Sequence, residues 1–148
     1  MNKKTMLLLN HICTWIFYPS FAALLLWMTF SGHSGFLRTV LTCGISFVVL
    51  SVYRHGRNAP RPYETDPRIE PPTANCRSGH SFPSRHVFSA WVIIMAFLYA
   101  APVFGVLLMI PGFALAYLRQ ALHFHHTKDV IVGALCGIVA GLIGFWIL

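Results

Sequence analysis

Long stretches without charged residues constrain the fold of this 148-residue chain more than any other feature. Asp, Glu, Lys and Arg are absent from residues 5–37, 39–53, 86–118 and 130–148. Charged residues make up 10% of the sequence, whereas a soluble domain carries about 25%. A helix that crosses a bilayer needs about 20 mostly apolar residues. The sequence therefore predicts an all-α integral membrane protein.

The uncharged stretches predict about five membrane-spanning helices, because Ala101-Pro102 divides the third stretch into two helices joined by a tight turn. We expect the spans near residues 8–30, 36–53, 85–101, 103–118 and 130–148. The sequence contains no segment typical of a linker, so residues 1–148 are expected to form one multi-pass domain. Arg38 falls in the second span, where its side chain must reach the interface or find a partner.

Two spans separate the N-terminus from residues 54–84, and two more separate these from residues 119–129, so all three segments are expected on the same side of the membrane. Ten of the eleven Lys and Arg residues fall on this side. Positive residues favour the cytoplasm, but several of these arginines are candidates for chemistry, so the orientation stays open. A site built from these segments would lie at one membrane face.

Three short clusters of basic residues and histidines lie at helix ends on this side. They are Arg54-x6-Arg61-Pro62, Pro83-Ser84-Arg85-His86 and Arg119-x5-His125-x3-Asp129. A guanidinium group presents a rigid fork of donors that matches phosphate oxygens. Arg54, Arg61 and Arg119 could therefore converge on a phosphate and stabilise the charge that develops at phosphorus. The alternative is that these arginines only hold the loop to an acidic lipid surface.

The second cluster is expected to begin a helix, with Ser84 as the N-cap after Pro83. The free backbone N–H groups at such a helix end bind anions. His86 would then lie in the first turn, beside a bound phosphate. There it could donate a proton to a leaving oxygen.

The third cluster supplies a candidate nucleophile. A neutral imidazole attacks phosphorus when one ring nitrogen is free and a carboxylate holds the other as N–H. Asp129 follows His125 by four residues, at the start of the last helix, and we predict that it orients His125. Alternatively, His86, His123, His125, His126 and Asp129 could ligate zinc or iron. The neighbouring arginines argue against a metal site, because they would repel a metal cation.

At these residues the sequence resembles the type 2 phosphatidic acid phosphatase family, which shares its active site with vanadium haloperoxidases. The family pattern is K-x6-R-P, then P-S-G-H, then S-R-x5-H-x3-D. This chain has R-x6-R-P at 54–62, P-S-R-H at 83–86 and L-R-x5-H-x3-D at 118–129. The resemblance implies a lipid phosphatase that works without a metal ion or other cofactor.

The resemblance also implies a role for each matching position. His125 would attack the phosphate and form a phosphohistidine, and Asp129 would orient it. His86 would protonate the leaving group and later activate water. The phosphate oxygens would be held by Arg54, Arg61, Ser84, Arg119 and the backbone N–H of residue 85.

Three positions depart from the family pattern. Arg54 replaces a lysine, Arg85 replaces a glycine and Leu118 replaces a serine. Arg85 adds a phosphate-binding cation that could favour a diphosphate over a monophosphate. The family commonly has six spans, so one peripheral helix is expected to be absent here.

A second segment, Arg77-Ser78-Gly79-His80, also resembles P-S-G-H and lies six residues earlier. We favour His86 as the proton donor, because His86 adjoins the predicted helix and His80 does not. The choice between the two histidines depends on how the loop folds.

These features predict a lipid phosphatase of a bacterial plasma membrane. Its candidate substrates are isoprenyl diphosphates such as undecaprenyl diphosphate, phosphatidic acid, phosphatidylglycerol phosphate and lipid A phosphate. The extra cations favour the isoprenyl diphosphates. The expected partners are this lipid and the bilayer, and not nucleic acid. Two other classes stay open: a non-catalytic phospholipid-binding or lipid-transport protein, which would not need His125, and a metal-dependent membrane enzyme.

Overall fold

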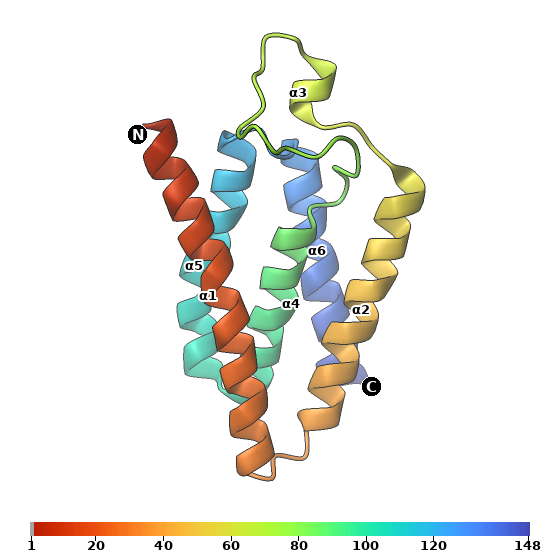
Figure 1. Ribbon diagram of the computed structural model, residues 1–148. Coiled ribbons are helices and arrows are strands. Elements are labelled where there is room, and N and C mark those ends of the chain that lie inside the picture. The colour runs from red at the N-terminus through yellow and green to blue at the C-terminus, as the bar shows by residue number, and fades with distance from the viewer. Residues whose placement is uncertain (1) are drawn as a thin grey trace.

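The computed structural model describes residues 2–148 and is helical, as the sequence predicts, with no strand in this range (Figure 1). Its long helices are α1 (Lys3–Phe30), α2 (Phe36–Arg57), α4 (Arg85–Ala100), α5 (Pro102–Ala121) and α6 (Thr127–Leu142). A single turn, α3 (Pro62–Thr65), interrupts the loop between α2 and α4, and a π-helical turn (Ile143–Ile147) extends α6. The predicted all-α bundle of about five spans is confirmed.

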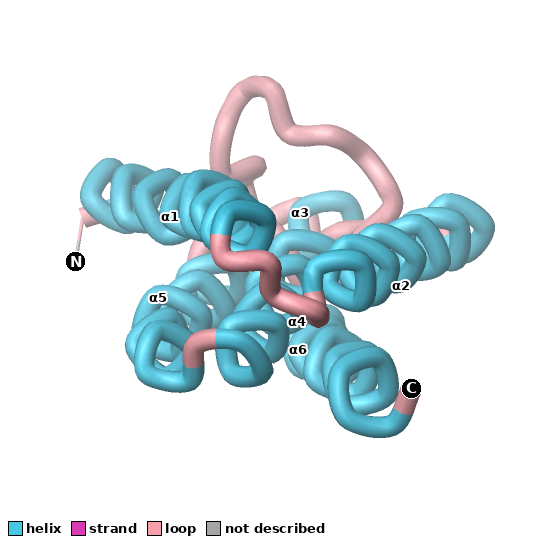
Figure 2. Tube along the Cα trace, turned by 90° about the horizontal axis from the view of Figure 1, so that it is seen from below, coloured by secondary structure: helices cyan, strands magenta, loops and turns pink. Residues whose placement is uncertain are grey.

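The helix α4 forms the centre of the bundle. It contacts α1, α2, α5 and α6, which surround it in the view along the bundle (Figure 2). Nine of its 16 residues are buried. At about 1.5 Å per residue, α4 is shorter than the roughly 30 Å hydrocarbon core, whereas the other four helices are long and apolar enough to cross it. Its first turn starts deeper in the bundle than the nearby ends of α5 and α6 (Figure 1).

Close packing of α6 on α4 depends on a row of glycines in α6. A Cβ atom on Gly133 would lie 2.7 Å from the Ser84 carbonyl oxygen, and one on Gly137 would lie 2.7 Å from the Phe88 carbonyl oxygen. Helices in membranes approach each other closely where small residues line the contact. The glycines therefore set the distance between α4, which begins at the second sequence cluster, and α6, which begins at the end of the third.

The outer surface of the bundle is apolar. Exposed side chains include Leu8, Val103, Ile110 and Ile147, which are 61%, 72%, 71% and 74% accessible. Such a surface suits contact with lipid. Arg38 finds a partner, as expected, because its guanidinium group donates to the carbonyl oxygens of Phe145 (3.2 Å) and Leu148 (3.3 Å).

Four helix boundaries differ from the predicted ones at the end of the bundle that holds the sequence clusters. α1 begins at Lys3 instead of residue 8, and α5 ends at Ala121 instead of residue 118. α2 continues to Arg57 instead of residue 53, which places Arg54 in its last turn. It ends where Asn58 takes the left-handed conformation, with φ 40°, and donates its N–H to the Arg54 carbonyl. α6 begins at Thr127 instead of residue 130, because the Asp129 carboxylate accepts the N–H of His126.

Candidate active site

All three sequence clusters lie at one end of the bundle, together with the N-terminus and α3 (Figure 1). The α1–α2 turn, the α4–α5 turn and the C-terminus lie at the opposite end. This arrangement is the one that five spans require. It places the candidate residues at a single face of the molecule.

Glu64 shapes the loop between α2 and α4. Its carboxylate accepts the backbone N–H of Arg61 (2.7 Å) and that of Gly79 (3.0 and 2.9 Å). The hydroxyl of Tyr63 donates to the Arg77 carbonyl (2.6 Å). Gly79 has φ 64°, a conformation that glycine adopts without strain. These contacts fold the loop back over the bundle and lead it to the start of α4.

His125 and Asp129 are buried side by side, 3% and 0% exposed. The distance from His125 Nδ1 to Asp129 Oδ2 is 3.7 Å, which is too long for a direct hydrogen bond. Ser81 lies between them: its hydroxyl donates to Asp129 Oδ2, and its oxygen is 3.3 Å from His125 Nδ1. Since the one hydroxyl proton goes to Asp129, Ser81 can accept the Nδ1–H of His125. This tautomer leaves Nε2 free to act as a nucleophile.

Ser81 is not among the site residues that the sequence predicts. A serine in a polar loop carries no signal of its own, and Ser81 becomes buried only because the loop folds back. Its backbone N–H donates to the Ala59 carbonyl (2.8 Å), which fixes its position. The predicted pair of His125 and Asp129 is therefore a cluster of three residues.

Asp129 also links α6 to the start of α4. Its backbone carbonyl accepts the N–H of Ser84 at 2.8 Å. Ser84 occupies the predicted N-cap position of α4, but its side chain makes no capping hydrogen bond. Ser84 is therefore the N-cap residue, as predicted, but the turn is held by the Asp129 carbonyl and not by a hydrogen bond to the Ser84 hydroxyl.

The arginines hold the backbone around the candidate nucleophile. Arg54 donates to the carbonyls of Pro83 (2.6 Å) and His80. Arg61 donates to those of Gly79 (3.0 Å) and Phe124 (3.3 Å). The two arginines thus fix the segments directly before Ser84 and directly before His125.

Arg119 lies in the last turn of α5, and its carbonyl accepts the N–H of His125 at 3.2 Å. Its guanidinium group is centred 5.0 Å from the ring of Phe124. It also donates to the Thr14 hydroxyl of α1 at 3.3 Å. No sequence signal predicts that Thr14 contacts a candidate phosphate ligand.

Several buried polar atoms in this region have no hydrogen-bond partner within residues 2–148. They include Ser84 Oγ, Arg119 Nε and Asp129 Oδ1, all in predicted site residues. A buried polar group without a partner costs free energy, so such groups call for a ligand or water. Ser84 Oγ and Arg119 Nε can both donate to an anion.

His86 occupies the first turn of α4 and is partly buried. It lines a cavity together with Arg85 and Ser89 of the same helix. His80 is placed differently: its Nδ1 is 3.2 Å from the Arg54 carbonyl, and its ring stacks on His55. The loop therefore turns the His80 ring toward the end of α2.

Cations surround the His125 imidazole. Burial lowers the pKa of His125 to about 4, with Arg61, Arg119 and Arg54 acting in the same direction and Asp129 opposing them. The imidazole is therefore neutral at pH 7. Within residues 2–148, no three His, Cys, Asp or Glu side chains are grouped to hold a metal ion.

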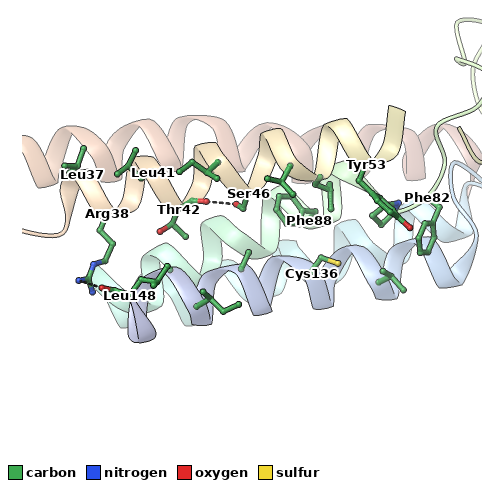
Figure 3. Close-up of a pocket in the computed structure, with 18 of the residues that line it drawn as sticks. Leu37, Arg38, Leu41, Thr42, Ser46, Tyr53, Phe82, Phe88, Cys136 and Leu148 are labelled. Carbon is green, nitrogen blue, oxygen red and sulfur yellow. Dashed lines mark hydrogen bonds between the residues drawn. The ribbon is translucent and has the colours of Figure 1, made fainter. Parts of the chain in front are cut away.

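A cavity of about 330 Å³ at this end of the bundle is lined by His125, and two other cavities lie nearby. The larger, of about 980 Å³, is an apolar furrow between α2 and α6 that runs from Tyr53 and Phe82 to Arg38 (Figure 3). No predicted catalytic residue lines it. The smaller, of about 200 Å³, lies between α1, α2, α4 and α5 and is lined by His86 and Arg85. The predicted catalytic histidines therefore line the cavities of about 200 and 330 Å³ and not the furrow.

Comparison with known proteins identifies a matching family and a solved structure with a similar fold. A family model described as the PAP2 superfamily matches residues 32–148, which include every predicted site residue but not α1. The crystal structure of Aquifex aeolicus LpxE is similar, with a TM-score of 0.79 and 20% sequence identity over 97% of this chain and 87% of that chain. No curated protein matches the chain.

Proposed function

The chain belongs to the PAP2 superfamily and is a membrane-embedded phosphoric ester hydrolase that acts on lipid, and from this premise we propose that it works through a phosphohistidine at His125. The family prediction made from the three clusters is confirmed. The proposed substrate is a lipid diphosphate of the isoprenyl class. The proposed site is the group of residues around Ser84 and His125. We place the enzyme in a bacterial plasma membrane and assign residues 1–148 to one domain.

The buried contact of Ser81 with both His125 and Asp129 is the observation that carries this proposal. In the first step, Nε2 of neutral His125 attacks the terminal phosphorus, and the bond from phosphorus to the leaving oxygen breaks. The positive charge that develops on the imidazole is balanced by Asp129 through Ser81. His86 gives its proton to the leaving oxygen.

In the second step, His86, now neutral, takes a proton from water as the water oxygen attacks the phosphohistidine. The bond from phosphorus to His125 breaks, inorganic phosphate leaves and both histidines return to their starting states. Throughout, the phosphate oxygens are held by Arg54, Arg61, Arg119, the Ser84 hydroxyl and the N–H of residue 85. The unpartnered donors Ser84 Oγ and Arg119 Nε support this assignment.

Arg85 supports a diphosphate substrate. It lines the cavity beside His86, and its guanidinium group is centred 5.7 Å from the ring of Phe47. It forms no ion pair within residues 2–148. A diphosphate brings a second phosphoryl group that such a cation can bind, whereas a monophosphate does not.

The test compares His125→Asn with His123→Asn in detergent-purified protein, with a chelator present. His123 is an exposed neighbour with φ 57°, a conformation that asparagine tolerates, so it is a matched control. We expect the wild type and His123→Asn to release phosphate from isoprenyl diphosphate, and His125→Asn to release none. Vanadate, which mimics five-coordinate phosphorus, should inhibit the release.

Three results would contradict the mechanism. Release that requires a metal ion would replace it with a metal-dependent one. Equal release by His125→Asn and the wild type would remove His125 as the nucleophile. Absence of release from every lipid phosphate, with the fold intact, would favour a binding or transport role.

A further inference from the structure

The first helix, which lies outside the family match, brings polar side chains to the cavity beside His86. Thr14 and Tyr18 are four residues apart, so they share one face of α1, and both line this cavity. Arg85, His86 and Ser89 of α4 form its opposite wall. Polar side chains within a membrane bundle are costly and commonly mark a substrate site.

Thr14 and Tyr18 contribute in different ways. The Thr14 hydroxyl donates to the Asn10 carbonyl at 2.7 Å and accepts from Arg119 at 3.3 Å, so its single proton is already used. Thr14 therefore positions Arg119 and does not donate to a ligand. The Tyr18 hydroxyl forms no hydrogen bond with any residue in 2–148, although Tyr18 lines the cavity. Its proton is available to a ligand in the cavity.

The position of the cavity identifies the part of the substrate that enters it. In an in-line displacement the leaving group departs opposite the nucleophile, and His86 is the group that protonates it. The cavity that His86 lines is therefore where the leaving group goes. Its deeper walls, Phe47, Ile93 and Leu115, are apolar and suit the beginning of a lipid chain.

We propose that this cavity receives the leaving group of the substrate and that Tyr18 and Arg85 select one that begins with a second phosphoryl group. The inference rests on the proposed function and deepens it. The departing lipid monophosphate carries its negative charge between the Arg85 guanidinium group and the Tyr18 hydroxyl. The alcohol that leaves a lipid monophosphate carries no charge, so its binding depends less on Arg85 and Tyr18.

The experiment measures kcat/KM for farnesyl diphosphate and farnesyl monophosphate, which share one lipid chain. Tyr18→Phe should lower the value for the diphosphate by about tenfold, the effect of one lost hydrogen bond to a charged group, and the value for the monophosphate much less. Thr14→Val should lower both values alike, because Arg119 holds the phosphate that reacts in either substrate. Thr14→Ser keeps the hydroxyl and should restore both.

Matched controls come from the larger cavity between α2 and α6, where Tyr53 and Thr42 are labelled in Figure 3. Tyr53→Phe and Thr42→Val remove the same atoms without touching the cavity beside His86 and should leave both values at the wild-type level. The inference is overturned if the diphosphate-to-monophosphate ratio of Tyr18→Phe equals that of the wild type or is matched by Tyr53→Phe. Absence of phosphate release by the wild type would overturn the proposed function and this inference together, whereas an unchanged ratio in an active enzyme overturns the inference alone.

Discussion

Replacement of Gly137 by alanine should separate the two helices that carry the candidate catalytic groups. An added Cβ would lie 2.7 Å from the Phe88 carbonyl oxygen, 2.9 Å from Trp91 Cβ and 3.1 Å from the Val92 nitrogen. These atoms belong to the backbone of α4 or adjoin it directly. No side-chain rotation can relieve the overlap, so α6 must move away from α4.

The size of the movement follows from the shortest contact. A carbon atom packs against a carbonyl oxygen at about 3.3–3.6 Å, so the helices must separate by roughly 0.6–0.9 Å. Overpacking of this kind costs about 1–3 kcal/mol. Because α4 carries His86 and α6 carries Asp129, the same shift disturbs the proposed site. A misplacement of about 1 Å can cost on the order of a hundredfold in rate.

We therefore expect Gly137→Ala to unfold at a lower temperature in detergent and to lose about ten- to a hundredfold in kcat/KM. Gly44→Ala in α2 is the control, since a Cβ there meets no atom within 4 Å. It should keep wild-type activity and stability. Wild-type behaviour of Gly137→Ala would refute the argument that close packing of α6 on α4 sets the geometry of the site. An equal loss in Gly44→Ala would show that the effect is not specific to this contact.

Three further predictions concern the cluster around the nucleophile. Ser81→Ala removes the hydroxyl between His125 and Asp129 and should lower kcat about ten- to a hundredfold, measured as steady-state phosphate release, with little change in KM; an unchanged kcat would exclude Ser81 from the cluster. Asp129→Asn keeps the shape but loses the charge that balances the imidazolium, so kcat should fall by about two to four orders of magnitude, and a loss below tenfold would contradict its role. Because the pKa of His125 is lowered to about 4, its ring should stay neutral as the pH falls from 7 and gain a proton only near pH 4. A difference NMR titration against His125→Asn checks this, and a midpoint near 6.5 would contradict it.

The sequence was sufficient to predict that the three clusters share one face of the membrane. Uncharged stretches locate the helices, and the two spans between residues 54–84 and 119–129 return the chain to the same side. The prediction needs only the length and polarity of the segments, and the structure confirms the helical bundle on which it rests. It does not need any knowledge of how the helices pack.

Ser81 could not be predicted in the same way, because its burial depends on hydrogen bonds between distant parts of the chain. Glu64 and Gly79 close the loop, and Arg54 holds the segment that follows. Neither helical periodicity nor residue type indicates how this loop folds. The family resemblance gives roles to His125 and Asp129 but not to Ser81, which lies between them in space.

Thr14 could not be predicted from the sequence for another reason. Serine and threonine are common in apolar helices, where their hydroxyls donate to the carbonyl four residues earlier, as Ser20, Thr29 and Ser46 also do here. Thr14 makes the same local bond and differs only in accepting from Arg119. That second contact depends on the packing of α1 against α5, so only the structure distinguishes Thr14 from the other hydroxyl residues.

The arginine at position 54 has a structural explanation that the family pattern alone does not supply. Its guanidinium group donates to two carbonyls of the loop, those of His80 and Pro83, and so fixes the segment that contains Ser81. A lysine presents one compact ammonium group and cannot hold two separated carbonyls with the geometry of a planar fork. The long loop before α4 enters the bundle because α4 begins below the ends of its neighbours (Figure 1). An arginine at the end of α2 therefore supplies the positive charge that the proposed phosphate site needs and also anchors the loop that places Ser81 against His125.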